Sequence, residues 1–313
     1  MTEIGPGTVL ITGPTGGLGR SATMGLANRP KAERPDLLLV GRPGRALHEI
    51  TAEARAAGAT VNEIGCDLAS LADTRAAGAA AKEIIASGAV RPLRGLVAGA
   101  GLMAADTRSA SADGYELTFA VNYLAHAQLI GSLLDSFTAP ARIVLVGSAT
   151  YYANWVRRLL QVPAAEWTDP LEIAKPAGPG VRPTRKAAGV AYSNSKLALL
   201  YYAHELQRRG PEGITVAVFE PGFMPGTGLG RQAGPGMQRM GRAIQRLPIP
   251  GIVSPAESGP ALASVTLDDR WAHLRDGDFV IVDREREVMP FAKDPARERE
   301  LWEATRELLT RAG

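Results

Sequence analysis

The chain has 313 residues, of which 45% are hydrophobic and 21% charged, and its formal net charge is +3. This length and composition are ordinary for a globular protein that buries a sizeable core. The small net charge and an aromatic content of 5% argue against a nucleic-acid-binding surface, which needs a basic patch or aromatic rings for base stacking.

Cysteines, histidines and the N-terminal segment narrow the class of protein further. Cys66 is the only cysteine, so no disulfide can form within the chain, which is typical of a reducing compartment. The histidines are scattered without metal-ligand spacing, and we expect no metal site. The first residues lack the pattern of a signal peptide, and no apolar run approaches the roughly 18 to 20 residues of a membrane span. We therefore expect a cytoplasmic protein without a membrane partner.

Short apolar segments alternate along the chain with longer segments of helical pattern. Strands are expected at residues 8–12, 36–41, 59–64, 94–99, 141–147, 214–219 and 278–283, and helices at 17–28, 44–57, 70–87, 112–136, 189–209 and 255–267. Nearly all-apolar strands that alternate with helices predict a parallel sheet covered on both faces. Right-handed crossovers then give an α/β fold of the doubly wound, Rossmann type, with a mainly seven-stranded parallel sheet in a single domain of residues 1–313.

Two irregular stretches interrupt this alternation. Residues 151–187 are rich in proline, glycine and arginine, and residues 222–254 in glycine, proline and methionine. Stretches of this length inside a compact domain are usually functional loops, and we interpret them as an insertion and a substrate lid. The chain closes with a predicted helix at 294–311, for which Asp294 is the N-cap and Pro295 the first helical residue.

A glycine-rich turn lies between the first predicted strand and the first predicted helix. In this turn Gly13, Gly17 and Gly19 have the spacing T-G-x-x-x-G-x-G. Small residues let the backbone approach a pyrophosphate, and the helix N-terminus offers unpaired N–H groups and a positive dipole end. Glycines also serve tight turns, but a position directly after the first strand favours a nucleotide. The predicted cofactor contacts here are Gly13, Thr15, Gly16, Gly17, Leu18 and Gly19.

The end of the second predicted strand indicates which dinucleotide binds. In such folds an acid at this point bonds the ribose 2′-hydroxyl of NAD, whereas an arginine accommodates the 2′-phosphate of NADP. Here Arg42 follows Gly41, and Arg45 lies just beyond. We therefore predict NADP(H), the alternative being that Arg42 is only a solvated surface residue. After the third predicted strand, Asp67 and Leu68 are placed beside the adenine.

Tyr192 and Lys196 are four residues apart in a predicted helix, so their side chains point to the same side. Tyrosine normally titrates near about 10, and an ammonium group one turn away favours the phenolate and lowers that pKa. Such a tyrosine can exchange a proton with a carbonyl or alcohol oxygen. Ser148 follows the fifth predicted strand, at the edge where α/β proteins bind ligands, and Asn122 lies in the fourth predicted helix.

In this order and spacing, the motifs resemble those of the short-chain dehydrogenase/reductase family over nearly the whole chain. The matching pieces are TGPTGGLG (12–19), CDL (66–68), VAGAG (97–101), VNYLAH (121–126), GS (147–148), YSNSK (192–196) and EPG (220–222). Within the family the sequence is most similar to the retinol dehydrogenase and protochlorophyllide reductase branch. That similarity is carried by ADGYELTFAVNYLAHAQL, the insertion before the tyrosine, PGFMPGTGL and the closing DPARERELWEATREL.

The resemblance implies a catalytic tetrad of Asn122, Ser148, Tyr192 and Lys196. Tyr192 would exchange the proton, and Ser148 would hydrogen-bond the same substrate oxygen. Lys196 would also hold the nicotinamide ribose, and Asn122 would anchor a water on a proton path. The further cofactor contacts implied by the resemblance are Ala98, Ala100, Gly101, Tyr192, Lys196, Pro221, Gly222, Met224 and Thr227. One departure is that Ala98-Gly99-Ala100-Gly101 replaces the family's Asn-Asn-Ala-Gly, whose asparagines usually brace the sheet.

Aromatic residues near the predicted site suggest the kind of substrate. Tyr151, Tyr152 and Trp155 follow Ser148, and Phe223 follows the Pro-Gly turn. Together with the methionines of the predicted lid, they suit a bulky apolar small molecule, the alternative being that they pack the loops onto the core. We expect an NADPH-dependent ketoreductase or alcohol dehydrogenase for a large hydrophobic carbonyl compound or secondary alcohol.

Other functions and assemblies stay open. A non-catalytic NADP(H)-binding sensor on the same fold would have no need of Ser148, Tyr192 and Lys196. A nucleotide-sugar epimerase or dehydratase usually has the spacing T-G-x-x-G-x-x-G and a larger C-terminal domain, and the chain has neither. Many members of the family form dimers through the fourth and fifth helices, and an insertion like 151–187 blocks that face in carbonyl-reductase-like members. A monomer and a homodimer are both compatible with the sequence.

Overall fold

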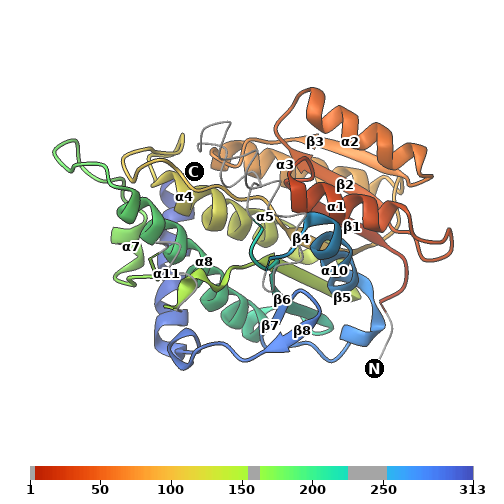
Figure 1. Cartoon of the computed structure of the whole chain (residues 1–313). Helices are drawn as coiled ribbons and strands as arrows, with labels where there is room; N and C mark the ends of the chain where they lie inside the picture. Colours follow the sequence, from red (N-terminus) through yellow and green to blue (C-terminus); the bar gives the residue numbers. More distant parts are fainter. Residues whose placement is uncertain (1–3, 154–162, 225–251, 313) are drawn as a thin grey trace.

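The protein is described by a computed structural model over residues 4–153, 163–224 and 252–312. One eight-stranded sheet has the order β3-β2-β1-β4-β5-β6-β7-β8 (Figure 1). The strands are β1 (Thr8–Thr12), β2 (Asp36–Gly41), β3 (Val61–Gly65), β4 (Leu93–Ala98), β5 (Phe137–Val146), β6 (Ile214–Glu220), β7 (Asp278–Ile281) and β8 (Arg284–Arg286). Strands β1 to β7 are parallel, which confirms the predicted fold class. The antiparallel β8 was not predicted, because its exposed Arg-Glu-Arg sequence has no apolar alternation.

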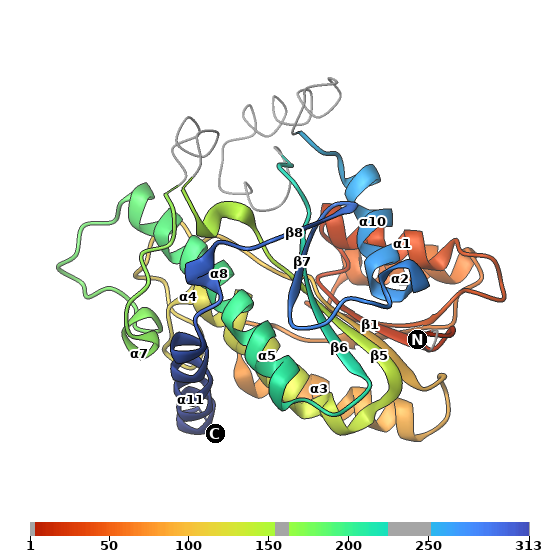
Figure 2. The same ribbon diagram turned by 90° about the horizontal axis from the view of Figure 1, so that it is seen from below.

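Helices cover both faces of the sheet (Figure 2). On one face lie α1 (Gly17–Ala27), α2 (Arg45–Ala56) and α10 (Pro255–Leu267), and on the other α3 (Leu71–Ala86), α5 (Ala125–Leu133) and α8 (Arg185–Arg209). Successive side chains of a strand point to opposite faces. Accordingly, Val9 and Ile11 belong to the buried cluster of α1 and α10, whereas Leu10 belongs to that of α5 and α8. The continuous apolar strands are therefore explained by burial on both faces.

The fourth predicted helix is composite and begins later than expected. It comprises α4 (Leu117–Phe119), a π-helical turn η1 (Ala120–Leu124), α5 and a 3-10 turn η2 (Leu134–Ser136). The helix begins at Leu117 because the carboxylate of Glu116 accepts hydrogen bonds from the N–H groups of Thr118 and Phe119. The wider π turn contains Asn122, so the helix is irregular at a predicted site residue.

This composite helix, Leu117–Ser136, is also the single segment among the described residues that is long and apolar enough to cross a membrane. The prediction that no segment approaches that length is therefore wrong. Within its most apolar window, 72% is buried inside the protein, as in the core helix of a soluble protein. Length and composition alone are weak grounds for a membrane span.

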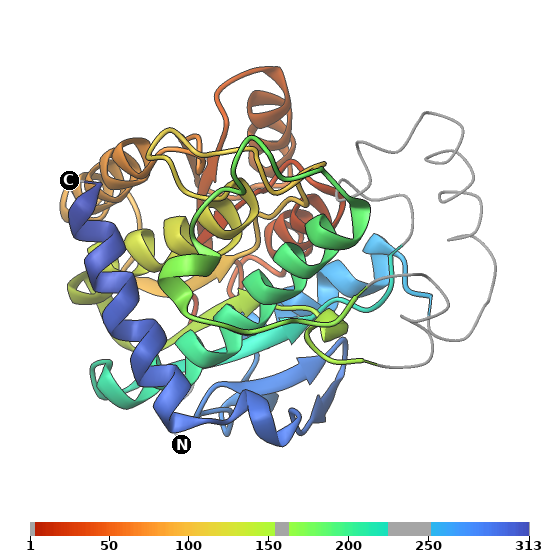
Figure 3. The ribbon, with the colours of Figure 1, turned by 90° about the vertical axis from the view of Figure 1, so that its left-hand side faces the viewer.

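The insertion and the C-terminal segment add elements outside α8. The short helix α7 (Pro170–Ile173) lies within the insertion, and α8 begins at Arg185 rather than 189 because the Thr184 side chain accepts a hydrogen bond from the Ala187 N–H. The last helix, α11 (Pro295–Arg311), is capped by Asp294 as predicted. It packs along α8 and α7 on the outside of the molecule (Figure 3). Of the predicted lid, only 222–224 and 252–254 belong to the described residues.

Candidate active site

The predicted cofactor and catalytic residues lie at the carboxyl edge of the sheet. Strand β1 is flanked by β2 on one side and by β4 on the other, so the chain winds away in both directions from this point. Doubly wound sheets bind ligands at such a switch point, next to the strand ends. The glycine-rich turn follows β1, Ser148 follows β5, and the Pro-Gly turn follows β6.

The glycine-rich turn has the open backbone that an anion needs. Gly13 has φ = 67°, and a Cβ there would lie 2.8 Å from the Cα of Ala100. A Cβ on Gly19 would collide with the carbonyl oxygen of Gly13. Helix α1 starts after Gly16 with no side-chain cap and no acidic residue in its first turn. Its first N–H groups are therefore available to a phosphate.

A cavity of about 510 Å³ opens between this turn and the residues that follow β2. Its lining residues are Thr15, Gly16, Gly17, Arg42, Pro43, Gly44, Arg45 and Ala46. Gly44 is the N-cap of α2, whose first turn also has no acidic residue. The Nε atom of Arg45 donates to the Glu49 carboxylate at 2.6 Å, which offsets part of its charge. Two arginines and two uncapped helix N-termini make this cavity suitable for phosphate groups of a dinucleotide.

Asp67 and Leu68 lie at the same edge of the sheet, one strand further out. Gly65 at the end of β3 pairs with Gly41 at the end of β2, so the residues after both strands are neighbours. The Asp67 carboxylate accepts a hydrogen bond from the Ala69 N–H at 3.1 Å, which shapes this turn. The structure therefore brings both residues to the predicted cofactor edge, and their contact with adenine stays a prediction.

Tyr192 and Lys196 face the same side of α8, as their spacing predicted. The Lys196 Nζ atom is 5.7 Å from the centre of the Tyr192 ring, and both side chains are buried. Nζ donates to the Val146 carbonyl at 2.7 Å, and an ammonium group has three donors in all. Burial lowers the pKa of Lys196 to about 8, and the Glu220 carboxylate opposes that shift. At neutral pH the lysine is therefore mostly charged but close to titration.

Ser148 occupies the turn directly after β5. Its Oγ atom accepts a hydrogen bond from the Thr150 N–H at 3.4 Å at the start of the 3-10 turn η3 (Ala149–Tyr151). This turn packs against α8, the helix that carries Tyr192 and Lys196. The fold thus places the serine turn beside the tyrosine–lysine helix, although more than forty residues separate them in the sequence.

Asn122 joins the same constellation from the π turn. Its Nδ2 atom donates to the Leu102 carbonyl at 2.9 Å and to Ser195 Oγ at 3.0 Å, and its Oδ1 accepts from the Leu102 N–H at 2.8 Å. A Cβ on Gly101 would lie 3.2 Å from Asn122 Oδ1 and 3.8 Å from Lys196 Nζ. Asn122 therefore adjoins the lysine, and its role as anchor of a water stays a prediction.

His126 is a site residue that sequence reasoning missed. Thr12 Oγ1 accepts hydrogen bonds from the N–H groups of Gly99 (2.9 Å) and Ala100 (3.1 Å), in the segment that lacks the family's asparagines. His126 Nε2 contacts the same Oγ1 at 2.9 Å, and Nδ1 contacts the Asn122 carbonyl at 3.0 Å. A carbonyl can only accept, so Nδ1 carries the proton and Nε2 accepts from Thr12. His126 and Thr12 thereby brace β1 against β4 in place of the asparagines.

The ring of His126 is neutral in this arrangement. Burial lowers its pKa to about 4, and the Lys196 charge adds to that effect. The sequence signal was its position four residues after Asn122, on the same face of the helix. A second missed residue is Glu220, a buried carboxylate at the end of β6, whose Oε2 atom accepts a hydrogen bond from the Ala149 N–H.

The structure divides the predicted substrate-pocket residues. Tyr151 is 2% exposed, packs against the rings of Tyr152 and Phe291, and accepts a hydrogen bond from the Met289 N–H at 3.1 Å. For Tyr151 the structure therefore shows the alternative, packing into the core. Phe223 forms an isolated β-bridge with Ile252, and Tyr152 is partly buried.

The Pro-Gly turn after β6 leads into this region. Gly222 has φ = 79°, and a Cβ there would lie 2.6 Å from Val253 Cγ2, so the turn requires glycine. Pro221 and Met224 flank it at the carboxyl edge. The predicted Trp155 and Thr227 lie outside the described residues. Within residues 4–153, 163–224 and 252–312, no group of three or more His, Cys, Asp and Glu side chains could hold a metal ion.

The sequence is similar to known dehydrogenases and reductases. A family model described as short chain dehydrogenase matches residues 7–157. Protochlorophyllide reductase A of Oryza sativa subsp. japonica is 30% identical, with 97% of this chain and 80% of that protein covered. A protein of Streptomyces sp. (strain C5) is 32% identical, with 69% of this chain and 65% of that protein covered. Its name, daunorubicin C-13 ketoreductase DnrU, describes an inferred activity.

Solved structures show the same fold at lower identity. NADPH-bound carbonyl reductase from chicken fatty liver has a TM-score of 0.65 at 18% identity, with 91% of this chain and 99% of that chain covered. A short-chain dehydrogenase/reductase from Burkholderia phymatum in complex with NAD has a TM-score of 0.56 at 20% identity, with 90% of each chain covered. Structures of this fold thus hold either dinucleotide.

Proposed function

Because the chain belongs to the short-chain dehydrogenase family and is an NAD(P)-dependent oxidoreductase, we propose that it is an NADPH-dependent ketoreductase or alcohol dehydrogenase for a bulky hydrophobic substrate. The observation that carries this proposal is the arrangement of Tyr192 beside the buried Lys196 on α8, with the Ser148 turn packed against that helix. We further propose that the protein acts in the cytoplasm, without a membrane or nucleic-acid partner.

Each residue has a definable part in such a reaction. When bound, NADPH supplies a hydride to the carbonyl carbon of the substrate. Tyr192 donates its hydroxyl proton to the carbonyl oxygen, which becomes the alcohol. The positive charge of Lys196 one helical turn away makes that hydroxyl a readier donor. Ser148 hydrogen-bonds the same oxygen and orients it toward the tyrosine.

The cavity after β2 supports the choice of NADPH over NADH. Arg42 offers a planar guanidinium that can bind phosphate with two hydrogen bonds, and Arg45 lies beside it. The backbone N–H groups at the starts of α1 and α2 add positive potential without any acidic side chain. A ribose 2′-hydroxyl would need an acceptor there, and none of the residues that line the cavity is acidic.

The proposed substrate class rests on aromatic residues next to two turns of the site and on the names of similar proteins. Phe223 and Tyr152 are aromatic residues next to the Pro-Gly and Ser148 turns, respectively. Two similar proteins are named for protochlorophyllide and daunorubicin, both large multi-ring molecules. We therefore propose a polycyclic or similarly bulky ketone, or the corresponding secondary alcohol, as the substrate class.

The test is to follow the absorbance of NADPH with purified protein and a panel of aromatic, polycyclic and terpenoid ketones. We expect turnover that falls by roughly 10²-fold or more in Tyr192→Phe, because the proton donor is lost. Tyr201→Phe is the matched control, since that hydroxyl lies on the same helix but donates to the Phe291 carbonyl. NADPH binding without turnover of any ketone would contradict the proposal and favour a cofactor-binding sensor.

A further inference from the structure

Glu220 places a carboxylate in the interior, at the end of a central strand. Its backbone is held on both sides, because Phe219 pairs with Val146 of β5 and Glu220 itself pairs with Ile281 of β7. The side chain is 3% exposed. A buried carboxylate is costly unless it is hydrogen-bonded or faces a positive charge, so its partners indicate why the chain keeps it there.

The first partner is the turn that carries Ser148. The Glu220 carboxylate accepts a hydrogen bond from the N–H of Ala149, the residue directly after the serine. On the other side of the serine, the Gly147 N–H donates to the Phe219 carbonyl at 2.8 Å. The N–H groups of both residues next to Ser148 are therefore tied to the last two residues of β6.

The ammonium group of Lys196 lies in the same interior region, where it is joined to the strand end next to Glu220. Its Nζ atom donates to the carbonyl of Val146, which is paired with the residue next to Glu220. Lys196 is 4% exposed, and the negative charge of Glu220 counteracts the effect of burial on its pKa. The other titratable groups around the lysine are Tyr192 on α8 and His126 on α5. The Tyr192 phenol and the His126 imidazole are uncharged in their neutral forms. Glu220 is therefore the anionic group of this set.

We propose that Glu220 is a positioning residue of the active site, which anchors the Ser148 turn through the Ala149 N–H and holds the buried Lys196 in its charged form. This inference rests on the proposed function. It assigns two separable tasks to the Glu220 side chain. The carboxylate accepts a hydrogen bond from the Ala149 N–H, and its negative charge stabilises the charged form of Lys196. Two conservative substitutions separate them.

Glu220→Gln keeps the length and an acceptor oxygen but removes the charge. Without that charge, the pKa of Lys196 falls further, so the lysine loses its proton at lower pH. We expect the alkaline limb of the kcat profile to move by about one pH unit or more toward acid. Glu116→Gln is the matched control, because Glu116 is also 3% exposed and hydrogen-bonded to backbone N–H groups but does not act on Lys196.

Glu220→Asp keeps the charge but shortens the side chain, so it loses contact with Ala149. We expect kcat to fall roughly tenfold at every pH, with the alkaline limb near its wild-type position, because only the serine turn has shifted. An unchanged pH profile in Glu220→Gln would overturn the charge role. An unchanged kcat in Glu220→Asp would overturn the anchoring role. If Glu220→Gln does not fold, the kcat of Glu220→Asp still decides the anchoring role.

A readout without turnover keeps this inference distinct from the proposed function. The side-chain resonance of Lys196 in lysine-labelled protein, assigned by its loss in Lys196→Met, is titrated in wild type and in Glu220→Gln. A lower pKa of Lys196 in the variant supports the charge role of Glu220 even if no ketone is reduced, and equal pKa values overturn it. Turnover that depends on Tyr192 but not on Glu220 would support the proposed function and overturn the inference about Glu220.

Discussion

Single residues show how polar groups are held inside this protein. The Thr12–His126 pair supplies one hydrogen-bond network at the switch point of the sheet. Lys196 and Glu220 are charged groups in the same interior region. Burying such charged groups lowers the free energy of unfolding unless they are paired. Where burial shifts a pKa, the effect can be measured as a dependence of stability on pH.

His126 is expected to make stability depend on acid. Because its pKa is lowered from 6.5 to about 4, the unfolded chain takes up a proton that the folded protein excludes. Stability is therefore fully present above pH 6.5 and is lost as pH falls toward 4, by roughly 3 kcal/mol in total. Urea unfolding across this range measures the loss. In His126→Gln the loss should shrink by most of that amount, and an identical acid dependence would contradict the assignment.

Arg42 is expected to decide cofactor preference. In Arg42→Ala, the KM for NADPH should rise roughly 10- to 100-fold while the KM for NADH stays within about twofold, because a charged hydrogen bond to phosphate is lost. Steady-state kinetics with both cofactors measures this. Arg45→Ala is the comparison, with a smaller expected effect because Arg45 is paired with Glu49. Equal losses for both cofactors would argue against a 2′-phosphate contact at Arg42.

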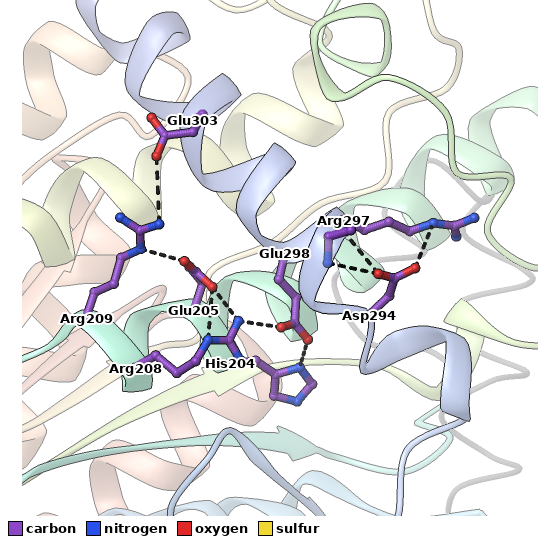
Figure 4. Close-up of polar contacts among 9 residues, drawn as sticks. His204, Glu205, Arg208, Arg209, Asp294, Arg297, Glu298 and Glu303 are labelled. Atoms are coloured by element: carbon purple, nitrogen blue, oxygen red, sulfur yellow. Dashed lines mark hydrogen bonds and ion pairs between the residues drawn. The ribbon is translucent and has the colours of Figure 1, made fainter.

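Among the elements, the contact between α8 and α11 ties the C-terminal segment to the helix that carries Tyr192 and Lys196. Glu298 of α11 lies between His204 and Arg208 of α8, with its carboxylate 2.7 Å from His204 Nδ1 (Figure 4). Trp302 stacks on Tyr202, with ring centres 5.6 Å apart. The buried Glu298, its bonds to the buried His204 and the half-exposed Arg208, and the stacked rings thus fix α11 against α8.

The two carboxylates of α11 shown in Figure 4 should differ in their effect on stability. Glu298→Gln removes the charge from a buried network, so we expect a loss of roughly 3 kcal/mol in the free energy of unfolding. Glu303→Gln is its control, since Glu303 pairs with Arg209 at 3.8 Å in an exposed position and should cost less than about 1 kcal/mol. Denaturant unfolding of both variants provides the comparison, and equal losses would contradict this account.

At the scale of the whole molecule, α11 lies on the outside of α8, and α7 packs against α11. The residues buried on α11 include Leu301 and Leu308, which belong to the same cluster as the core of α5 and α8. A surface that the chain covers with its own C-terminal helix is not available to a second copy.

We therefore expect a monomer in solution. Light scattering after size exclusion should give the mass of one chain, 33.0 kDa, independent of protein concentration. A stable dimer that persists on dilution would contradict this expectation. Leu301→Ala tests the physical reason, because loosening α11 should lower stability by about 2 to 5 kcal/mol and leave the mass unchanged where the protein is folded.

Local patterns in the sequence determined much of this protein. Apolar strands alternating with helices, the glycine spacing after β1, and a tyrosine four residues before a lysine depend only on neighbours in the chain, so the fold class and the positions of Ser148, Tyr192 and Lys196 could be predicted. The boundaries that were wrong, at Glu116 and Thr184, depend on side-chain caps that residue periodicity does not show.

Tertiary structure alone decided which distant residues meet. Lys196 is joined to the strand end next to Glu220, His126 braces Thr12, and Tyr151 packs into an aromatic cluster with Phe291, because the winding of the sheet brings together strands and helices that are far apart in the chain. A single sequence carries no distance between such positions. Burial then shifts the pKa values of these side chains and fixes their hydrogen-bond partners. In water the same side chains would have ordinary pKa values and no fixed partners.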